Sequence, residues 1–181
     1  MNLAAVLKLS EEGQWLQNPV LSEKLWPALA ETLLMVGFSG VLTVVFGLPL
    51  GLLLVSSSKT GLRPRPALNH VLGAIVNVVR SFPFIILIVA LIPLTRLITG
   101  TSLGWQATVV PLTIGAIPFF ARLVESNVAA VPAGKIEAAQ MLGASPLQIQ
   151  WGVQVREARA QLIHSVTLLL ITLVGYSAMA G

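Results

Sequence analysis

Long runs of apolar residues, separated by short polar segments, set the pattern of this chain. Four such runs are present, at residues 28–55, 68–94, 105–121 and 162–180. A helix needs about 20 predominantly apolar residues to cross a bilayer. The pattern therefore predicts four transmembrane helices. The first run is long enough to tilt or to extend past the hydrocarbon, and the third run is short.

The composition agrees with this pattern. The chain has 181 residues, of which 55% are hydrophobic and only 10% are charged, whereas soluble domains carry about 25% charged residues. This number of charges is too small to cover a water-facing surface. We therefore predict an all-α, polytopic transmembrane helix bundle in contact with membrane lipid. No cysteine is present, which excludes disulfides and thiol catalysis. The N-terminal segment lacks the apolar core and cleavage site of a secretory signal.

The distribution of positive charge predicts the orientation, because cytoplasmic loops are rich in Lys and Arg. The polar segments after the first and third runs carry most of the basic residues, namely Lys59, Arg63, Arg65, Arg122, Lys135, Arg156 and Arg159. The segment after the second run holds only Arg96. We therefore expect an extracytoplasmic N-terminal segment, 1–27, followed by a transmembrane domain, 28–181. None of the basic segments is dense enough for nucleic-acid binding.

One polar segment, KIEAAQMLGASPLQIQW at residues 135–151, lies in the longest predicted cytoplasmic loop. Good helix formers fill residues 133–142, and Gly143 is placed to end that helix in the left-handed conformation. Ser145, Pro146 and Gln148 have the spacing of a helix start with a capping box. The segment therefore predicts a helix, a tight turn and a second helix. An amphipathic helix lying on the membrane surface is the alternative.

Within this segment, EAAQMLGASPLQ resembles the cytoplasmic signature of binding-protein-dependent ABC importer permeases. VNVVRSFPFIILIVALIPLTRLITGTSLG, VPLTIGAIPFFARLVE and ITLVGYSAMAG are similar to the methionine-importer branch of that family. The resemblance covers roughly residues 28–181. It implies that the hairpin is a coupling helix that docks on an ATPase subunit. The docking positions carried over are Glu137, Ala138, Ala139 and Gly143.

The resemblance also implies partners, a substrate and a location. It predicts a homodimer of permease chains with two ABC ATPase subunits and an extracytoplasmic methionine-binding protein, in the bacterial inner membrane. The transported substrate would be D- and L-methionine. Family members usually continue past the SAMAG stretch into a further span, which this chain is expected to lack. A truncated, non-transporting membrane scaffold or regulator that binds the ATPase is therefore the alternative function.

Other energy sources and activities are disfavoured by the sequence. No phosphate-binding loop of the G-x-x-x-x-G-K-[ST] type is present, so ATP hydrolysis is assigned to a partner. Glu31 and Glu125 are the acidic residues nearest the spans, and both lie close to span ends, whereas ion-coupled carriers place carboxylates near the midplane. The sequence shows no arrangement of a nucleophile and a base that would indicate an enzyme. We expect no cofactor, and His70 and His164 lack a third ligand for a metal.

Four residues in the apolar runs are candidates for lining a substrate pathway, namely Arg80, Tyr176, Ser177 and Met179. A charge at mid-depth in a membrane is costly, so Arg80 either lines a pathway or subunit contact or reaches the cytoplasmic surface with its long side chain. A pathway with polarizable apolar walls and few polar groups would suit a substrate that carries a thioether. Simple packing is the alternative for each of the other three.

Prolines, glycines and one charge pair complete the predicted pattern. Pro83 is expected to kink the second span, and Pro111 and Pro118 to break the third into short pieces. The G-x-x-x-G pair in GLPLG, Gly47 and Gly51, predicts close helix packing, either within the chain or between subunits. Arg122 and Glu125 have the i, i+3 spacing of a helical ion pair.

Overall fold

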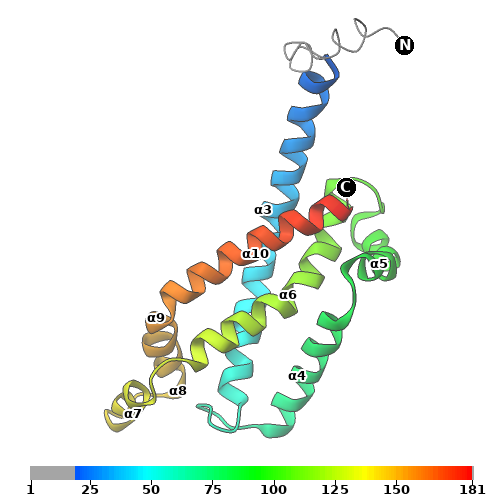
Figure 1. Ribbon diagram of the computed structural model, residues 1–181. Helices are drawn as coiled ribbons and strands as arrows, with labels where there is room; N and C mark the ends of the chain where they lie inside the picture. The colour runs from blue at the N-terminus through cyan, green and yellow to red at the C-terminus, as the bar shows by residue number, and fades with distance from the viewer. Residues whose placement is uncertain (1–18, 181) are drawn as a thin grey trace, which may run out of the picture.

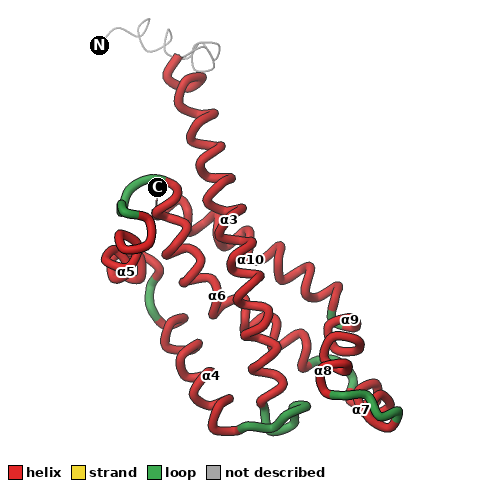
Figure 2. The backbone as a smooth tube through the Cα atoms, turned by 180° about the vertical axis from the view of Figure 1, so that it is seen from behind, coloured by secondary structure: helices red, strands yellow, loops and turns green. Residues whose placement is uncertain are grey.

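The computed structural model describes residues 19–180, and every regular element within them is a helix (Figure 1). In chain order the elements are α3 (Pro19–Ser57), α4 (Pro66–Ser81), α5 (Phe84–Thr99), α6 (Trp105–Ala129), α7 (Ala133–Met141), α8 (Pro146–Ile149), the π-helix η1 (Gln150–Gln154), α9 (Val155–Glu157) and α10 (Arg159–Ala180). Figure 2 shows that the connections are short and that most of them lie at the two ends of the bundle. The predicted all-α polytopic bundle is confirmed.

Helix α3 is much longer than a bilayer requires. Its 39 residues rise by about 58 Å, against a hydrocarbon core of about 30 Å. The N-terminal half projects beyond the other helices (Figure 1), and its Trp26 and Leu33 are exposed. The predicted span began at residue 28, but the helix already begins at Pro19. The predicted extension past the hydrocarbon fits this length, and residues 1–18 lie outside the described part of the chain.

Helix α6 is the centre of the bundle, since it contacts α3, α4, α5 and α10. Its Leu112, Ala116, Phe120 and Val124 follow one another at intervals of four residues and are almost completely buried. The prediction that prolines break this span is wrong, because α6 runs unbroken from Trp105 to Ala129 with both prolines inside it. Proline removes one backbone hydrogen bond, but neighbouring helices on several sides hold a membrane helix in place despite that loss.

The glycine pair of GLPLG lets α3 and α6 approach closely. A Cβ atom on Gly47 would lie 2.9 Å from Cδ1 of Phe120, and one on Gly51 would lie 2.6 Å from the carbonyl oxygen of Ala121. Real Cβ atoms do not come so close to a backbone oxygen, so a larger residue would push the helices apart. Of the two interpretations of the G-x-x-x-G pair, the structure supports packing within the chain.

The second apolar run forms two helices instead of one kinked span. Helices α4 and α5 meet at an angle of 108°, and the break falls at Phe82 and Pro83. Phe82 is extended (φ −78°, ψ 131°), as expected for a residue before proline. The kink was predicted at the right residue, but the bend between the two helices is larger than a kink within one span. In the described residues three helices are individually long and apolar enough to cross a membrane, and a fourth span results if α4 and α5 count together.

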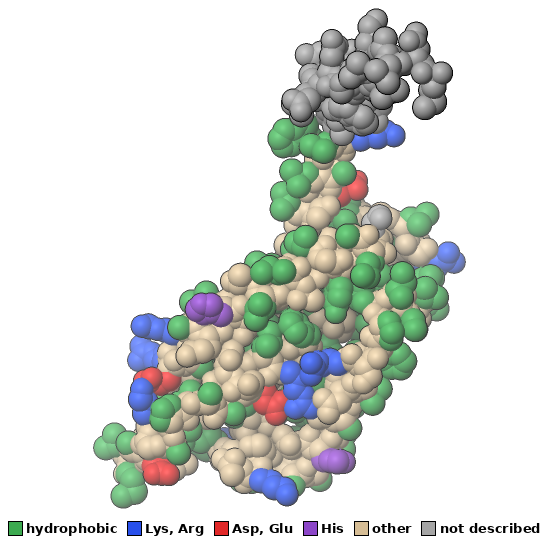
Figure 3. All heavy atoms as spheres, viewed as in Figure 1, with side chains coloured by type: hydrophobic (Ala, Val, Ile, Leu, Met, Phe, Trp, Pro, Cys, Tyr) green, Lys and Arg blue, Asp and Glu red, His purple; other side chains and the backbone are tan. Residues whose placement is uncertain are grey.

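Helix α10 packs one narrow face against the bundle and exposes the rest. Ser165, Leu169, Leu173 and Ser177 recur every four residues and are buried. Large apolar side chains cover its other faces, including Ile163 and Ile171. On the face of the molecule seen in Figure 3, apolar side chains are also spread over the other helices. Such a surface is suited to lipid or to other membrane-spanning subunits.

Candidate functional site

The predicted hairpin is present, and its turn has the expected geometry. Helix α7 ends before Gly143, whose φ of +77° lies in the left-handed region. The Gly143 N–H donates to the Gln140 carbonyl at 2.9 Å, and the Ala144 N–H donates to the Ala139 carbonyl at 3.1 Å. These two hydrogen bonds form a Schellman motif, which satisfies the last carbonyls of a helix. The glycine therefore ends α7 as the sequence predicts.

The start of α8 also matches the prediction. The Gln148 N–H donates to Oγ of Ser145 at 3.4 Å, and the Ser145 N–H donates to Oε1 of Gln148 at 2.8 Å, which completes a capping box. Pro146 occupies the first helical position, where its missing N–H costs nothing. With a closing motif on one side and a capping box on the other, the hairpin has a defined shape.

The tip of the hairpin presents its small residues to the outside. Glu137, Ala138 and Gly143 are exposed, while Ala139 is half-buried. Next to them, the side chains of Met141 and Leu142 are 89% and 87% exposed, the two highest values among the large apolar residues described. In water such exposure is unfavourable. A tip of this kind is therefore suited to insertion into a groove of another protein.

The base of the hairpin is attached to the membrane helices by polar contacts. The Lys135 ammonium forms an ion pair with the Glu157 carboxylate of α9. Gln150 is buried, and its Nε2 donates to the Leu52 carbonyl of α3 at 2.9 Å. Because 98 residues separate Gln150 from Leu52, sequence spacing could not indicate this contact. A displacement of the hairpin would therefore pull directly on α3.

A short π-helix links the hairpin to the last membrane helix. Residues of η1, Gln150–Gln154, continue into α9 and a turn at Ala158, after which α10 begins at Arg159. π-Helices are rare and are frequently found at functional sites. The sequence predicts a second helix after the turn but does not indicate a π-helix within it. The wider turn of η1 therefore forms an irregular connection between the exposed hairpin and α10.

Two of the four pathway candidates lie together. Arg80 and Tyr176 line one hollow of 160 Å³ between α4, α5, α6 and α10, whose other lining residues are Val79, Phe82, Phe84, Leu87, Gly115 and Phe119. The rings of Tyr176 and Phe84 are stacked, with centroids 4.1 Å apart. Arg80 is exposed in the last turn of α4, close to the break before α5. The hollow thus combines aromatic walls, one guanidinium and one phenol.

The other two candidates lie elsewhere. Ser177 is buried, and its hydroxyl donates to the Val174 carbonyl of its own helix at 2.9 Å. Met179 is 60% exposed and is not among the residues that line the hollow. Tyr176 and Met179 share a helix face by spacing, but only Tyr176 lines the hollow.

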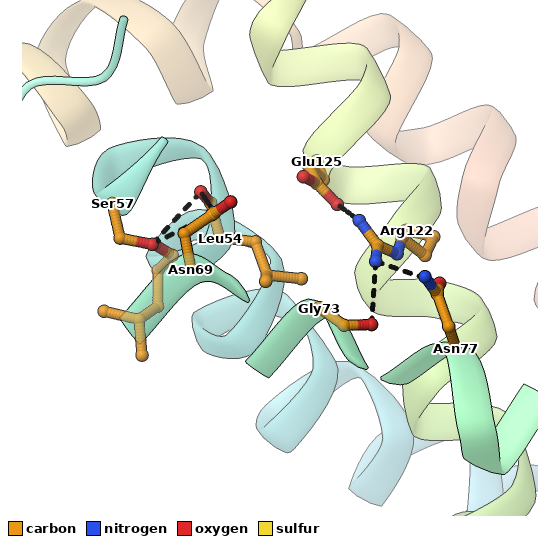
Figure 4. Close-up of polar contacts among 8 residues, drawn as sticks. Leu54, Ser57, Asn69, Gly73, Asn77, Arg122 and Glu125 are labelled. Carbon is orange, nitrogen blue, oxygen red and sulfur yellow. Dashed lines mark hydrogen bonds and ion pairs between the residues drawn. The ribbon is translucent and has the colours of Figure 1, made fainter. Parts of the chain in front are cut away.

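The predicted ion pair belongs to a larger polar cluster (Figure 4). Nη1 of Arg122 lies 2.6 Å from Oε2 of Glu125 on α6, which confirms the i, i+3 pair. Nη2 of the same guanidinium donates to the Gly73 carbonyl at 3.1 Å and to Oδ1 of Asn77 at 2.9 Å, both on α4. The sequence did not indicate these partners, which lie more than forty residues away. The cluster joins α4 to α6.

The sequence predicts no metal site at its two histidines, because neither has a third ligand nearby. His70 on α4 and His164 on α10 are both exposed, and Nδ1 of His164 lies 2.7 Å from the Ala160 carbonyl. Within residues 19–180, no three His, Cys, Asp or Glu side chains lie close enough together to hold a metal ion.

The chain is similar to known membrane transport proteins over most of its length. Residues 44–181 match the family model described as "Binding-protein-dependent transport system inner membrane component". A Vibrio cholerae protein named probable D-methionine transport system permease protein MetI is 52% identical over 160 residues, which are 88% of this chain and 71% of that protein. The Escherichia coli K12 D-methionine transport system permease protein MetI is 47% identical over 173 residues, 96% of this chain and 76% of its own length.

The fold is similar as well. A chain from a crystal structure described as inward-facing conformations of the MetNI methionine ABC transporter superposes with a TM-score of 0.83 at 46% identity. The superposition covers 94% of this chain and 75% of that one. The resemblance found in the signature hairpin is thus confirmed over the whole transmembrane part, and this chain belongs to the family of inner membrane components of binding-protein-dependent transport systems.

Proposed function

We propose that this chain is the membrane-spanning permease subunit of an ATP-driven ABC importer that moves methionine, in D- and L-forms, across the inner membrane. The observation that carries the proposal is the identity of 47–52% to permeases named for D-methionine transport, over nearly the whole chain. ATP hydrolysis is assigned to a separate ATPase. Two ATPase subunits, a second permease chain and an extracytoplasmic methionine-binding protein complete the proposed complex, in which this chain has no catalytic role.

The proposed ATPase contact is the tip of the α7–α8 hairpin. Glu137, Ala138 and Gly143 are exposed there, and Ala139 lies half-buried beside them. The exposed Met141 and Leu142 add apolar surface that a groove in the ATPase would cover. Binding of an apolar helix tip in a groove is a common mode of protein recognition. Motion of the ATPase would then reach α3 through Gln150 and α10 through η1.

The proposed substrate path includes the hollow between α4, α5, α6 and α10. Arg80 offers a positive charge for a carboxylate, and the aromatic rings of Phe84 and Tyr176 offer a polarizable surface for a thioether. A hollow of 160 Å³ is large enough for a small amino acid side chain. Ser177 and Met179, which were also candidates, lie outside this hollow and are left out of the proposal.

The proposed orientation places the N-terminal segment 1–27 outside the cell and the hairpin in the cytoplasm. The 58–65 segment and the α7–α8 hairpin, which carry several basic residues, lie at the same end of the bundle, whereas α5, which carries Arg96, lies nearer the other end (Figure 1). Positive charge is enriched on the cytoplasmic side of membrane proteins. The remainder, residues 28–181, is the proposed transmembrane domain, although its first helix already begins at Pro19.

Reconstitution tests the function. The chain would be incorporated into liposomes with its ATPase, and uptake of labelled D- and L-methionine would be measured with the binding protein outside and ATP inside. We expect ATP-dependent uptake that requires the binding protein and is competed by unlabelled methionine but not by a charged amino acid such as lysine. ATPase binding without any uptake would instead identify a non-transporting scaffold. Uptake of other amino acids alone would refute the assigned substrate.

A further inference from the structure

A second hollow, of 270 Å³, lies near the C-terminal end of α3. Three segments far apart in the sequence form its walls: the last turns of α3, the 58–65 segment with the start of α4, and the α8–η1 segment. Its apolar wall includes Leu53, Leu147 and Trp151, which remain 43%, 55% and 51% exposed. Leu53 belongs to a candidate membrane span, so this wall includes part of the exposed apolar surface of that span.

Two arginines give the hollow a positive rim. Arg63 and Arg65 line it, and both are exposed. Among the described residues, neither forms an ion pair with a carboxylate. Helix α4 begins directly after Arg65 and has no acidic residue in its first turn, so the positive end of the helix dipole adds to the same field. The hollow therefore joins an apolar wall to positive charge that the described part of the chain leaves without a counter-ion.

The segment that carries the arginines is fixed in place. The Arg63 N–H donates to the Ser56 carbonyl at 2.9 Å, and the Arg65 N–H donates to the Ser57 carbonyl at 3.0 Å. A Cβ atom on Gly61 would lie 2.3 Å from the Val55 carbonyl oxygen, so this residue must be glycine for the segment to lie so close to α3. Backbone contacts thus fix the main chain at both arginines before any ligand binds, which lowers the entropic cost of ordering this segment.

We propose that this hollow binds one anionic phospholipid. The phosphate lies between Arg63 and Arg65, and one acyl chain follows the wall formed by Leu53, Leu147 and Trp151. Basic hollows between membrane helices on the cytoplasmic side recognise anionic headgroups, and tryptophan is enriched at headgroup level. The inference rests on the orientation proposed above, which places this end of the bundle at the cytoplasmic face. The lipid would then contact both α3 and the base of the hairpin.

Native mass spectrometry of the purified full chain tests the proposal. Detergent micelles would contain phosphatidylglycerol or phosphatidylcholine with the same acyl chains. We expect phosphatidylglycerol to be retained preferentially, and Arg63→Gln or Arg65→Gln to weaken its binding about fivefold each, the effect of one basic residue at an anionic surface. Lys59→Gln removes the same charge from the same segment but outside the hollow, so it should weaken binding less than about twofold. Arg63→Lys keeps the charge and should retain binding.

Three outcomes would overturn the proposal. Equal losses for the two arginine variants and Lys59→Gln would indicate unspecific attraction to the surface. Binding of water-soluble glycerol phosphate as tight as that of phosphatidylglycerol would indicate a site for a free anion. Displacement of the lipid by the added ATPase would identify the hollow as a protein contact. Since lipid retention is measured without transport, a chain that binds phosphatidylglycerol but fails methionine uptake would refute only the proposed function.

Discussion

At the residue scale, Gly51 sets how closely α3 and α6 can approach. A Cβ atom there would lie 2.6 Å from the Ala121 carbonyl oxygen and 2.6 Å from Cβ of Val124. Gly51→Ala should therefore destabilise the bundle by about 1–3 kcal/mol, the usual effect of overpacking. Thermal unfolding in detergent, followed by size-exclusion chromatography, would measure this loss. Gly37→Ala is the matched control, because nothing lies within 4 Å of its Cβ position on the same helix. Equal stability of the two variants would contradict the close contact.

Glu137 tests the docking surface with a single charge. Its side chain is exposed at the hairpin tip, so a substitution there should leave the fold of the permease intact. Glu137→Lys should reduce co-purification of the ATPase at least about tenfold, because truncating or reversing a charge within an interface commonly costs 2 kcal/mol or more. Thr60→Lys adds a positive charge to an exposed position at the same end of the bundle and should leave co-purification unchanged. Undiminished binding by Glu137→Lys would argue against docking at this tip.

The residues that the sequence predicted correctly are those whose partners are close in the chain. Gly143, the Ser145 and Gln148 capping box and the Arg122–Glu125 pair all act within five residues, where helix geometry alone fixes which groups meet. The contacts of Gln150 with Leu52 and of Arg122 with α4 span 98 and 45–49 residues. Such contacts depend on how the helices pack against one another. No periodic pattern in a single sequence indicates that packing.

At the scale of an element, the hairpin depends on the left-handed conformation of one residue. Gly143 has a φ of +77° and nothing within 4 Å of its Cβ position, so alanine there would meet only backbone strain. Gly143→Ala should cost about 1–2 kcal/mol and loosen the turn. Hydrogen exchange of the amides of residues 133–149 should then become about tenfold faster. Gly134→Ala lies in α7 without positive φ or close neighbours and should slow exchange instead, since alanine favours a helix. Identical exchange in both variants would show that the turn does not constrain the hairpin.

One guanidinium on α6 provides polar contacts that join α4 to α6. Arg122 bonds both Gly73 and Asn77 of α4 while paired with Glu125 (Figure 4). Arg122→Leu should release α4 by about 1–2 kcal/mol, the range of charge-assisted hydrogen bonds at a partly exposed site. Faster hydrogen exchange in residues 66–81, with little change in α10, would be the signature of this release.

Arg96→Leu is the control for that experiment. Its guanidinium is exposed on α5 and bonds Oγ of Ser102 at 3.2 Å, so its loss should leave exchange in α4 unchanged. If both arginine variants behave alike, the polar cluster does not hold the two helices together.

The elements differ in how well the sequence located them. The apolar runs predict four spans, and the described residues hold three such helices, with a fourth span if α4 and α5 count together. The effect of proline was misjudged in both directions. At Pro83 the chain turns by 108°, whereas Pro111 and Pro118 leave α6 continuous. Burial alone does not explain the difference: both α6 prolines are buried and Pro83 is exposed, but Pro27, Pro49 and Pro93 are also exposed and lie inside continuous helices. Proline removes the same hydrogen bond in every case, so the residue alone does not predict where the chain breaks.

At the scale of the whole molecule, the structure provides a continuous mechanical connection from the hairpin to the membrane helices. The exposed tip is followed by Gln150, which bonds α3, and by η1, which continues toward α10. Asn127 of α6 in turn donates to Oγ of Ser165 on α10 at 2.7 Å. A rigid displacement of the hairpin therefore acts on α3, α6 and α10 together, as transport by movement between two discrete arrangements requires.

The connection works in this way only if the ends of the bundle face opposite sides of the membrane, and a thiol-labelling experiment can decide that. The chain contains no cysteine, so single-cysteine variants report without background. Thr60, Leu103 and Gln140 are exposed in or beside three successive connections. If α4 and α5 together cross the membrane, an impermeant maleimide should label Leu103→Cys in intact cells, while Thr60→Cys and Gln140→Cys should react only after lysis. If the bent pair is re-entrant instead, Thr60→Cys and Leu103→Cys would react from the same side, and Gln140→Cys from the other. That second pattern would put the hairpin and the 58–65 segment on opposite faces and would refute the proposed orientation.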